Sequence, residues 1–228
     1  MVNRIVVALD YPAVDQARAM AERLLDDVAG FKVGLELVSG TGPEAIATVA
    51  ALGKPVFADL KLHDIPNTVQ GAAARIAAAG ARWVTVHASG GLEMVEAAVA
   101  GMGGKGVLAV TVLTSFAERD LESIGVRSGI ENQVIGLAEL AVAAGVEGLV
   151  CAPGDVAAIR AKGILSTVFT PGIRLEGSTS TDDQKRVGTP ISAVAAGADY
   201  LVIGRPITKA PDPLSAVREI TASLAEFD

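Results

Sequence analysis

The feature that most constrains the fold of this chain is a regular alternation of two kinds of segment. Short runs rich in Val and Ile, typical of buried strands, alternate with Ala-rich segments of helical period. Eight such pairs fill the 228 residues, and no composition shift or linker interrupts them. This pattern predicts a single domain over residues 1–228, an α/β fold of the (β/α)₈ TIM-barrel class, with a doubly wound sheet as the alternative.

The expected elements follow directly from this alternation. The predicted strands are 5–9, 30–33, 56–60, 83–87, 107–113, 148–151, 167–170 and 200–203. The predicted helices are roughly 13–25, 43–52, 68–79, 91–100, 132–144, 154–162, 189–196 and 213–226. Several helices are expected to stop at a glycine that leads into a strand: Gly53, Gly80, Gly101, Gly145 and Gly197. The longest stretches expected to be irregular are 114–131 and 171–188.

Composition and charge limit the classes of function. Half of the residues are hydrophobic and 20% are charged, which is ample material for a core. The net charge is −7 and there is no basic run, so a nucleic-acid partner is not expected. The absence of a signal peptide and of an apolar run near about 18 residues predicts a cytoplasmic protein without a membrane partner. The single cysteine, Cys151, excludes an internal disulfide and is expected in the core.

Residues 56–68 combine features that a buried strand would avoid. The segment begins with the apolar run of a strand and then places Asp59, Lys61 and Asp64 within six residues. Asp59 and Lys61 are two apart, so they point to the same side of an extended chain. Pro66 then marks a loop and the start of a helix. Two acids and a base are therefore expected to converge at the carboxyl end of a strand.

The predicted barrel favours a functional explanation of this cluster over a strand end whose charges simply pair and solvate themselves. Active sites of such barrels lie at the carboxyl ends of the strands. Polar and ionisable residues follow the predicted strands at this end: Asp10, Lys32, Asp59 with Lys61, His87 with Ser89, Thr114, Arg174, and Gly204 with Arg205. This gathering at one end of the strands predicts an active site there.

The cations at this end predict an anionic ligand, because the chain as a whole is acidic. They are Lys32, Lys61, Arg174 and Arg205. Arg174 follows the seventh predicted strand, and Arg205 follows the eighth. The loops after these two strands often hold phosphate in barrels of this fold, and Pro206 suits the first turn of a short helix there. The alternative for Arg205 is an ion pair with a surface acid.

The sequence predicts no bound metal and no organic cofactor. The only histidines are His63 and His87, and neither has a second ligand at metal-binding spacing. Asp59 and Asp64 could hold Mg²⁺, but Lys61 would compete with the ion as their counter-charge. There is also no glycine motif for a dinucleotide.

The remaining chemistry is that of carboxylates and an ammonium group acting on a phosphorylated substrate. Asp59 and Asp64 would keep Lys61 protonated, because an opposite charge nearby favours the charged form. A protonated lysine can deliver a proton to a carbanion that develops at carbon. A protein carboxylate beside a substrate carboxylate would repel it, and this repulsion fades as CO₂ leaves, which favours decarboxylation.

The segment 57–68, Phe-Ala-Asp-Leu-Lys-Leu-His-Asp-Ile-Pro-Asn-Thr, closely resembles the signature of the orotidine 5′-phosphate decarboxylase family. The resemblance covers nearly the whole chain. It extends to Val-Ala-Leu-Asp ending at Asp10, Lys-Val-Gly from Lys32, Val-His-Ala-Ser-Gly-Gly at 86–91, Val-Thr-Val-Leu-Thr-Ser at 110–115, Thr-Pro-Gly-Ile-Arg ending at Arg174, Asp-Gln-Lys-Arg at 183–186 and Gly-Ala-Asp-Tyr-Leu-Val-Ile-Gly-Arg-Pro-Ile at 197–207.

This resemblance implies conversion of orotidine 5′-monophosphate to uridine 5′-monophosphate, the last step of pyrimidine nucleotide synthesis, without metal or organic cofactor. Lys61 would donate the proton, and Asp59 and Asp64 would flank the departing carboxylate. The implied substrate contacts are Asp10 and Lys32 to the ribose, Thr114 to the pyrimidine edge, Arg174, Gly204 and Arg205 to the phosphate, Gln184 to phosphate and base, and also Ile65 and Thr68. In the family Asp64 and Thr68 reach into the neighbouring subunit's site, so the resemblance implies a homodimer with shared active sites.

Two other functions remain open at this point. Sister enzymes of the same barrel group, the sugar-phosphate decarboxylases and hexulose-phosphate synthases, share an Asp-x-Lys-x-x-Asp core but require Mg²⁺. The Ile-Pro-Asn-Thr continuation at 65–68 and Leu-Thr-Ser at 113–115 favour the nucleotide enzyme. The other alternative is a non-catalytic nucleotide-binding barrel. One departure bears on Gln184, because the loop that leads to it from Arg174 looks one residue longer than in bacterial relatives.

Overall fold

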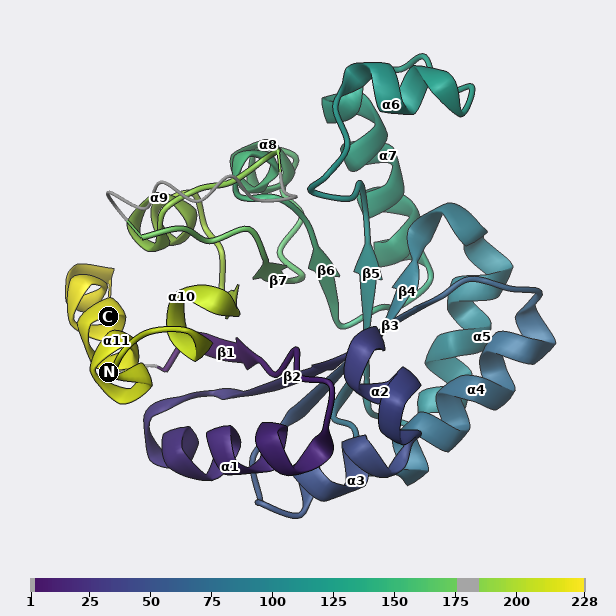
Figure 1. Cartoon of the computed structure of the whole chain (residues 1–228). Coiled ribbons are helices and arrows are strands. Elements are labelled where there is room, and N and C mark those ends of the chain that lie inside the picture. The colour runs from purple at the N-terminus through teal and green to yellow at the C-terminus, as the bar shows by residue number, and fades with distance from the viewer. Residues whose placement is uncertain (1–2, 176–184, 228) are drawn as a thin grey trace.

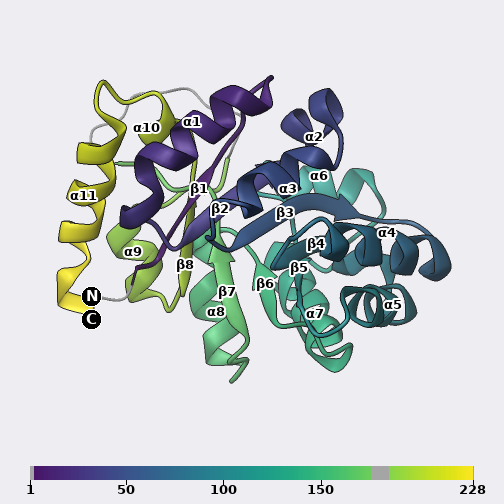
Figure 2. The same cartoon turned by 90° about the horizontal axis from the view of Figure 1, so that it is seen from below.

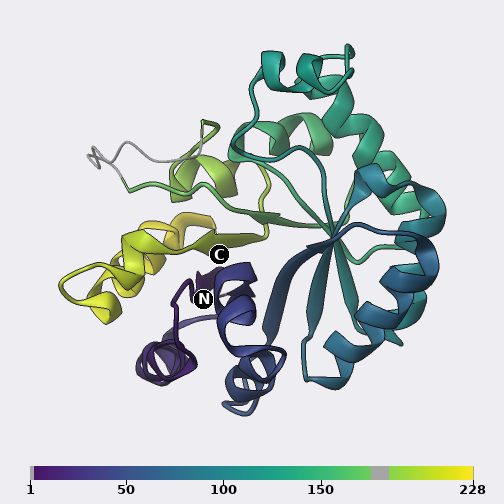
Figure 3. The same cartoon turned by 45° about the vertical axis from the view of Figure 1, so that its right-hand side comes forward.

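The computed structural model describes residues 3–175 and 185–227, which form a closed barrel of eight parallel strands (Figures 1 and 3). The strands are β1 Ile5–Ala8, β2 Gly30–Gly34, β3 Val56–Leu62, β4 Trp83–His87, β5 Gly106–Val110, β6 Gly148–Val150, β7 Thr167–Thr170 and β8 Tyr200–Ile203. Each strand pairs with the next along the chain, and β8 closes the barrel against β1, where Leu201 lies opposite Ile5. The predicted (β/α)₈ barrel is therefore confirmed.

Helices surround the strands on the outside of the barrel (Figure 3). They are α1 Val14–Leu24, α2 Leu35–Thr41, α3 Glu44–Ala50, α4 Pro66–Ala78, α5 Leu92–Met102, α6 Glu118–Ser123, α7 Ile130–Ala143, α8 Val156–Ala161, α9 Pro190–Ala195, α10 Arg205–Thr208 and α11 Pro213–Ser223, with short 3₁₀ turns at Leu25–Asp27, Ala88–Gly90, Pro153–Asp155 and Ala225–Phe227. The two ends of the chain lie close together (Figure 2), and Arg4 donates a hydrogen bond to the carbonyl of Phe227.

Two helices, α2 and α6, lie where the sequence predicted none. Helix α2 follows β2 directly and fully buries only Leu37. Helix α6 lies inside the stretch 114–131 that was expected to be irregular, and its one buried residue is Leu121. Six or seven residues with a single buried position do not give a helical period, so such helices depend on tertiary contacts for their formation.

The limits of two strands also differ from the prediction. Strand β5 ends at Val110 rather than at 113, because the carbonyl oxygens of Val112 and Leu113 accept hydrogen bonds from the guanidinium of Arg186. Strand β3 continues to Leu62 instead of ending at 60, and its pairing with β4 contains an irregularity within this extension.

Glycines end the helices much as predicted, with one correction. Gly53, Gly80, Gly145 and Gly197 follow α3, α4, α7 and α9 and have φ angles of 85°, 101°, 81° and 105°, which favour glycine. The predicted stop at Gly101 is wrong, because α5 continues to Met102 and ends at Gly103 with φ 58°. A Cβ atom at Gly101 would collide with the Gln70 carbonyl of α4. This glycine therefore allows α4 and α5 to pack side by side (Figures 1 and 2).

The hydrophobic core has two parts. Aliphatic side chains fill the layer between strands and helices, and a smaller cluster fills the inside of the barrel. The inner cluster is built around the fully buried Phe169, whose ring lies 5.6 Å from that of Phe57 and 5.2 Å from that of Trp83. These rings form edge-to-face pairs, a favourable aromatic arrangement. Since Phe57 also lines the cavity described below, this cluster closes the barrel beneath that cavity.

No helix among the described residues is both long and apolar enough to cross a membrane.

Candidate active site

A cavity of about 300 Å³ opens at the carboxyl ends of the barrel strands. Eight of the residues predicted for the site line it: Asp10, Lys32, Asp59, Lys61, Thr114, Arg174, Gly204 and Arg205. They lie within β2 and β3 or in the segments that follow β1, β5, β7 and β8, so the closed barrel brings together residues that are far apart in the sequence. Apolar side chains, among them Val110 and Val202, complete the wall.

Four charged side chains form a chain of alternating sign in this cavity. The Lys61 ammonium donates a 2.8 Å hydrogen bond to Oδ1 of Asp59, and the ammonium of Lys32 lies 3.5 Å from Oδ2 of the same carboxylate. Lys32 also donates a 2.9 Å hydrogen bond to Asp10. The side chains of Lys32 and Asp59 are only 12% and 14% exposed, whereas that of Asp10 is half exposed at the mouth. Asp59 therefore lies between two ammonium groups with little access to water.

The electrostatics of this chain keep its buried members ionised. Burial alone would raise the pKa of Asp59, but the charges of Lys32 and Lys61, with hydrogen bonds from Lys61 and Thr85, lower it below its ordinary value. Burial alone would lower the pKa of Lys32, but Asp59 and Asp10 raise it overall. Both shifts favour the charged forms at neutral pH.

The backbone at Lys61 is not extended, which corrects one step of the sequence argument. Lys61 has φ 49°, and among the described residues no other non-glycine has a positive φ. The side chains of Asp59 and Lys61 do meet, as predicted, but across an irregular part of β3 rather than along a regular strand. The sequence analysis also missed Thr85 of β4, whose hydroxyl contacts both residues. The available signal was a hydroxyl in the middle of the apolar run 83–87.

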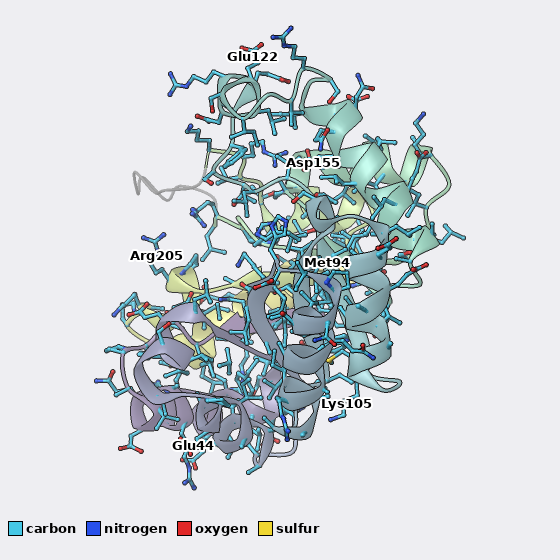
Figure 4. All side chains as sticks on the ribbon, turned by 90° about the vertical axis from the view of Figure 1, so that its right-hand side faces the viewer. Glu44, Met94, Lys105, Glu122, Asp155 and Arg205 are labelled. Carbon is cyan, nitrogen blue, oxygen red and sulfur yellow. The ribbon has the colours of Figure 1, made fainter. Side chains whose placement is uncertain are left out.

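The loops after β7 and β8 form the other wall of the cavity. Gly172 and Arg174 line it from the first loop, and Gly204 and Arg205 line it from the second. The helix α10 begins at Arg205 and has Pro206 in its first turn, as predicted. Figure 4 shows Arg205 at the edge of the molecule, on the opposite side of the view from Lys105, which precedes β5. The predicted pairing of arginine and glycine after each of these strands is thus part of the cavity.

A buried ion pair that the sequence analysis did not assign supports the wall after β5. Arg186 donates two hydrogen bonds of 2.7 Å to the carboxylate of Asp155, which Figure 4 labels, and two more to the carbonyls of Val112 and Leu113. Its backbone N–H donates to the carbonyl of Thr114. Burial raises the pKa of Asp155 even though Arg186 opposes this shift. Arg186 thereby fixes the segment that carries Thr114, although the motif 183–186 was noted only for its resemblance.

Three predicted residues after β3 do not line the cavity of the single chain. Asp64, Ile65 and Thr68 are all exposed, and Ile65 is 67% exposed. The carboxylate of Asp64 accepts a 2.6 Å hydrogen bond from the backbone N–H of Ile65. The expected role of Gln184 lies outside the described residues.

Neither a metal-binding cluster nor a reactive thiol accompanies the charged chain. Within residues 3–175 and 185–227, no group of three or more His, Cys, Asp or Glu side chains could hold a metal ion. Cys151 is a buried residue of the cavity wall, and burial raises the pKa of its thiol far above the ordinary value. The prediction that Cys151 is a core residue is confirmed.

The closed barrel and the charged cavity at the carboxyl ends of its strands define a (β/α)₈-barrel enzyme. The model of the Orotidine 5'-phosphate decarboxylase / HUMPS family matches residues 3–220, and the chain belongs to this family. The family resemblance inferred from the sequence is therefore confirmed.

Individual relatives agree with this assignment over almost their whole length. A protein of Anaeromyxobacter sp. (strain K) named orotidine 5'-phosphate decarboxylase is 52% identical, over 97% of this chain and 98% of the relative. A protein of the same name from Chromohalobacter salexigens is 48% identical, over 97% and 96% of the two chains. The crystal structure of orotidine 5'-phosphate decarboxylase from Lactobacillus acidophilus superimposes with a TM-score of 0.83 at 34% identity, over 97% and 98% of the two chains.

Proposed function

We propose that this chain decarboxylates orotidine 5′-monophosphate to uridine 5′-monophosphate, the last step of pyrimidine nucleotide synthesis, and that it does so without a cofactor. Family membership and the names of its relatives support the reaction. The observation that carries the mechanism is the alternating chain Lys61, Asp59, Lys32 and Asp10 inside the cavity.

In the proposed mechanism, Lys61 and Asp59 act on the two ends of the bond that breaks. The carboxylate of Asp59 repels the substrate carboxylate, and the repulsion disappears as CO₂ leaves. The electron pair of the broken carbon–carbon bond stays on the pyrimidine carbon. The ammonium of Lys61 then transfers a proton to that carbon, and solvent returns a proton to the amine. The hydrogen bond from Lys61 to Asp59 supports this role, since it keeps the ammonium beside the group that strains the substrate.

Binding of the nucleotide would use the rest of the cavity. We assign Arg174, Gly204 and Arg205 to the phosphate, because guanidinium groups and glycine N–H groups suit its oxygens. The alternating acid and base of Asp10 and Lys32 suit the ribose hydroxyls, which both donate and accept hydrogen bonds. The Thr114 side chain would contact the pyrimidine edge from the wall after β5. The family resemblance also implies that Gln184 contacts both the phosphate and the base.

The shared site of a homodimer is also a proposal. Asp64 and Thr68 lie outside the cavity of their own chain, and the apolar side chain of Ile65 is largely exposed between them. A second copy could bury Ile65 and receive Asp64 and Thr68 at its own site, with the relation made reciprocal by two-fold symmetry. A cytoplasmic location stays a prediction from the sequence.

The second candidate is a Mg²⁺-dependent sugar-phosphate enzyme, because such enzymes share the Asp-x-Lys-x-x-Asp core of this chain. The contacts of Asp59 favour the nucleotide enzyme. Its Oδ1 faces the ammonium of Lys61 and its Oδ2 faces that of Lys32, so both oxygens already have a positive partner. A metal ion at this carboxylate would have to displace at least one of them.

The direct test is to add orotidine 5′-monophosphate to the purified protein and to follow the ultraviolet absorbance of the pyrimidine together with released CO₂. We expect conversion with one CO₂ per uridine 5′-monophosphate. Binding without turnover would favour the non-catalytic nucleotide-binding barrel. Absence of both binding and turnover would reject this substrate.

A further inference from the structure

The feature that carries a further inference is the irregular pairing between β3 and β4. Ala58 lies opposite Val84, and the next registered pair is Leu62 opposite Val86. Four residue steps along β3 therefore correspond to two along β4, and Thr85 is the residue of β4 at this interval. Asp59 and Lys61 both lie between Ala58 and Leu62, the part of β3 that bulges out of register with β4. The bulge therefore carries the proposed reaction centre.

We propose that Thr85 is a positioning residue for the reaction, and that its single hydroxyl fixes both the backbone of Lys61 and the carboxylate of Asp59. This inference deepens the proposed function and rests on it, since Thr85 acts through the two residues assigned to the chemistry. Neither the resemblance nor the family match assigns Thr85 a role.

The hydroxyl replaces a hydrogen-bond partner that the bulge removes. In a bulge the extra residues lose their regular partners on the neighbouring strand. The backbone N–H of Lys61 instead donates a 2.9 Å hydrogen bond to Oγ1 of Thr85. Thr85 is 0% exposed, so water has no access to this hydroxyl. Without the hydroxyl, a buried N–H would lose its partner, which is unfavourable.

The same hydroxyl also orients the carboxylate. Thr85 donates a 3.0 Å hydrogen bond to Oδ1 of Asp59, the oxygen that accepts the bond from the Lys61 ammonium. A hydroxyl has one proton to donate, so accepting from Lys61 and donating to Asp59 defines its orientation. Lys61 is thereby held at both ends, by Thr85 at its backbone and by Asp59 at its ammonium.

The backbone conformation of Lys61 explains why such support is needed. Its φ of 49° is in the left-handed region, which is unfavourable for a residue with a Cβ atom. Conformations of this kind persist only where the surroundings determine them, and they are common at active sites. The bond from Lys61 to Thr85 is the contact that ties this conformation to a neighbouring strand.

The experiment compares Thr85→Val, which removes the hydroxyl at nearly constant volume, with Thr85→Ser, which retains it. Thr111→Val is the matched control, because Thr111 is also buried and its hydroxyl donates to the Val150 carbonyl without contacting Asp59 or Lys61. Circular dichroism and thermal unfolding establish that each variant is folded. Turnover of orotidine 5′-monophosphate then gives kcat and KM separately.

We expect Thr85→Val to lower kcat by about 10- to 100-fold, as for a lost hydrogen bond to a charged group, with a much smaller change in KM. Thr85→Ser should recover most of this loss, and Thr111→Val should keep the wild-type kcat. A folded Thr85→Val with wild-type kcat would overturn the proposal. So would a Thr85→Ser variant as slow as Thr85→Val, because it retains the hydroxyl.

A second measurement on the unchanged protein keeps the proposal testable if Thr85→Val does not fold. Amide hydrogen exchange followed by NMR should show a strongly protected N–H at Lys61, because that N–H donates to a buried hydroxyl. Rapid exchange at Lys61, at a rate similar to that of exposed loops, would overturn the role of Thr85. If the wild type does not turn over orotidine 5′-monophosphate, the proposed function fails by itself, while protection at Lys61 still decides whether Thr85 holds the bulge.

Discussion

The ammonium of Lys61 lies 2.8 Å from the carboxylate of Asp59, only two residues earlier on the same strand. This short separation in sequence becomes a contact because β3 bulges between them and Lys61 has a left-handed backbone. The second oxygen of Asp59 faces Lys32 of the neighbouring strand β2. The acid is thus held by ammonium groups from two strands, and in the proposed mechanism its position sets where the substrate carboxylate is strained.

Replacing Lys61 by alanine should abolish most turnover while the protein stays folded. The variant loses the ammonium that the proposed mechanism uses to protonate the product carbon, and general acid catalysis typically contributes about 100- to 10,000-fold. Measured kcat should therefore fall by at least about 100-fold. Lys105→Ala is the matched control, because Lys105 lies at the opposite face of the barrel and donates to the Ala77 carbonyl. Substantial turnover by the Lys61→Ala protein would contradict its role as proton donor.

Replacing Asp59 by asparagine should change how stability depends on pH. The folded pKa of Asp59 is lowered below its ordinary value of 3.8, so the folded state binds this proton less tightly than the unfolded state. The stabilisation by Asp59 is therefore present above pH 3.8 and is lost as the pH falls through the lowered folded pKa. Urea unfolding from about pH 6 to about pH 3 should show a shallower loss in the variant than in wild type. Identical slopes would mean that Asp59 is not stabilised as an anion.

The sequence predicted the barrel because its signal is repeated along the whole chain. Each strand is a buried apolar run, and each long helix contributes several buried residues at helical spacing. The elements that it missed lack this redundancy. In the first turn of helix α6, the carboxylate of Asp120 accepts a hydrogen bond from the backbone N–H of Ala117. The same carboxylate forms an ion pair with Lys185. A contact across 65 residues of sequence does not leave a local pattern.

The candidate site could be predicted in part, because most of its residues lie at the carboxyl ends of the predicted strands. Lys32 lies in β2, and Asp59 and Lys61 lie in the carboxyl-terminal half of β3, so knowing the barrel was enough to bring them together. Thr85 and Arg186 were missed because they act on other residues rather than on the cavity itself. A buried threonine inside a strand resembles any other core position until the bulge opposite it is known.

Replacing Arg205 by alanine should weaken binding of the phosphorylated substrate. Arg205 lines the cavity directly after β8, and a charge-assisted hydrogen bond is worth about 1.5–3 kcal/mol. KM should rise by roughly 10- to 150-fold, and kcat should also fall if phosphate binding contributes to the chemical step. Lys209→Ala provides the control, since Lys209 is an exposed cation just after α10 that does not line the cavity. Unchanged kcat and KM in Arg205→Ala would make this arginine structural.

Exhaustive chelation should leave the activity intact. Both oxygens of Asp59 face ammonium groups, and the proposed mechanism transfers its proton from Lys61 without a metal ion. Turnover is measured before and after dialysis against EDTA, with and without added Mg²⁺. Loss of activity that Mg²⁺ restores would move the protein to the sugar-phosphate branch of its family.

Mixing two inactive variants tests whether Asp64 acts in the site of the other subunit. Lys61→Ala and Asp64→Ala should each be nearly inactive alone. If each site takes Lys61 from one chain and Asp64 from the other, a mixed dimer has one site with both defects and one with neither. Random exchange makes about half of the dimers mixed, so equimolar mixing should restore about a quarter of wild-type activity. Subunit exchange is verified by mass spectrometry of differently tagged chains, and a verified exchange without recovered activity would show that Asp64 serves its own chain.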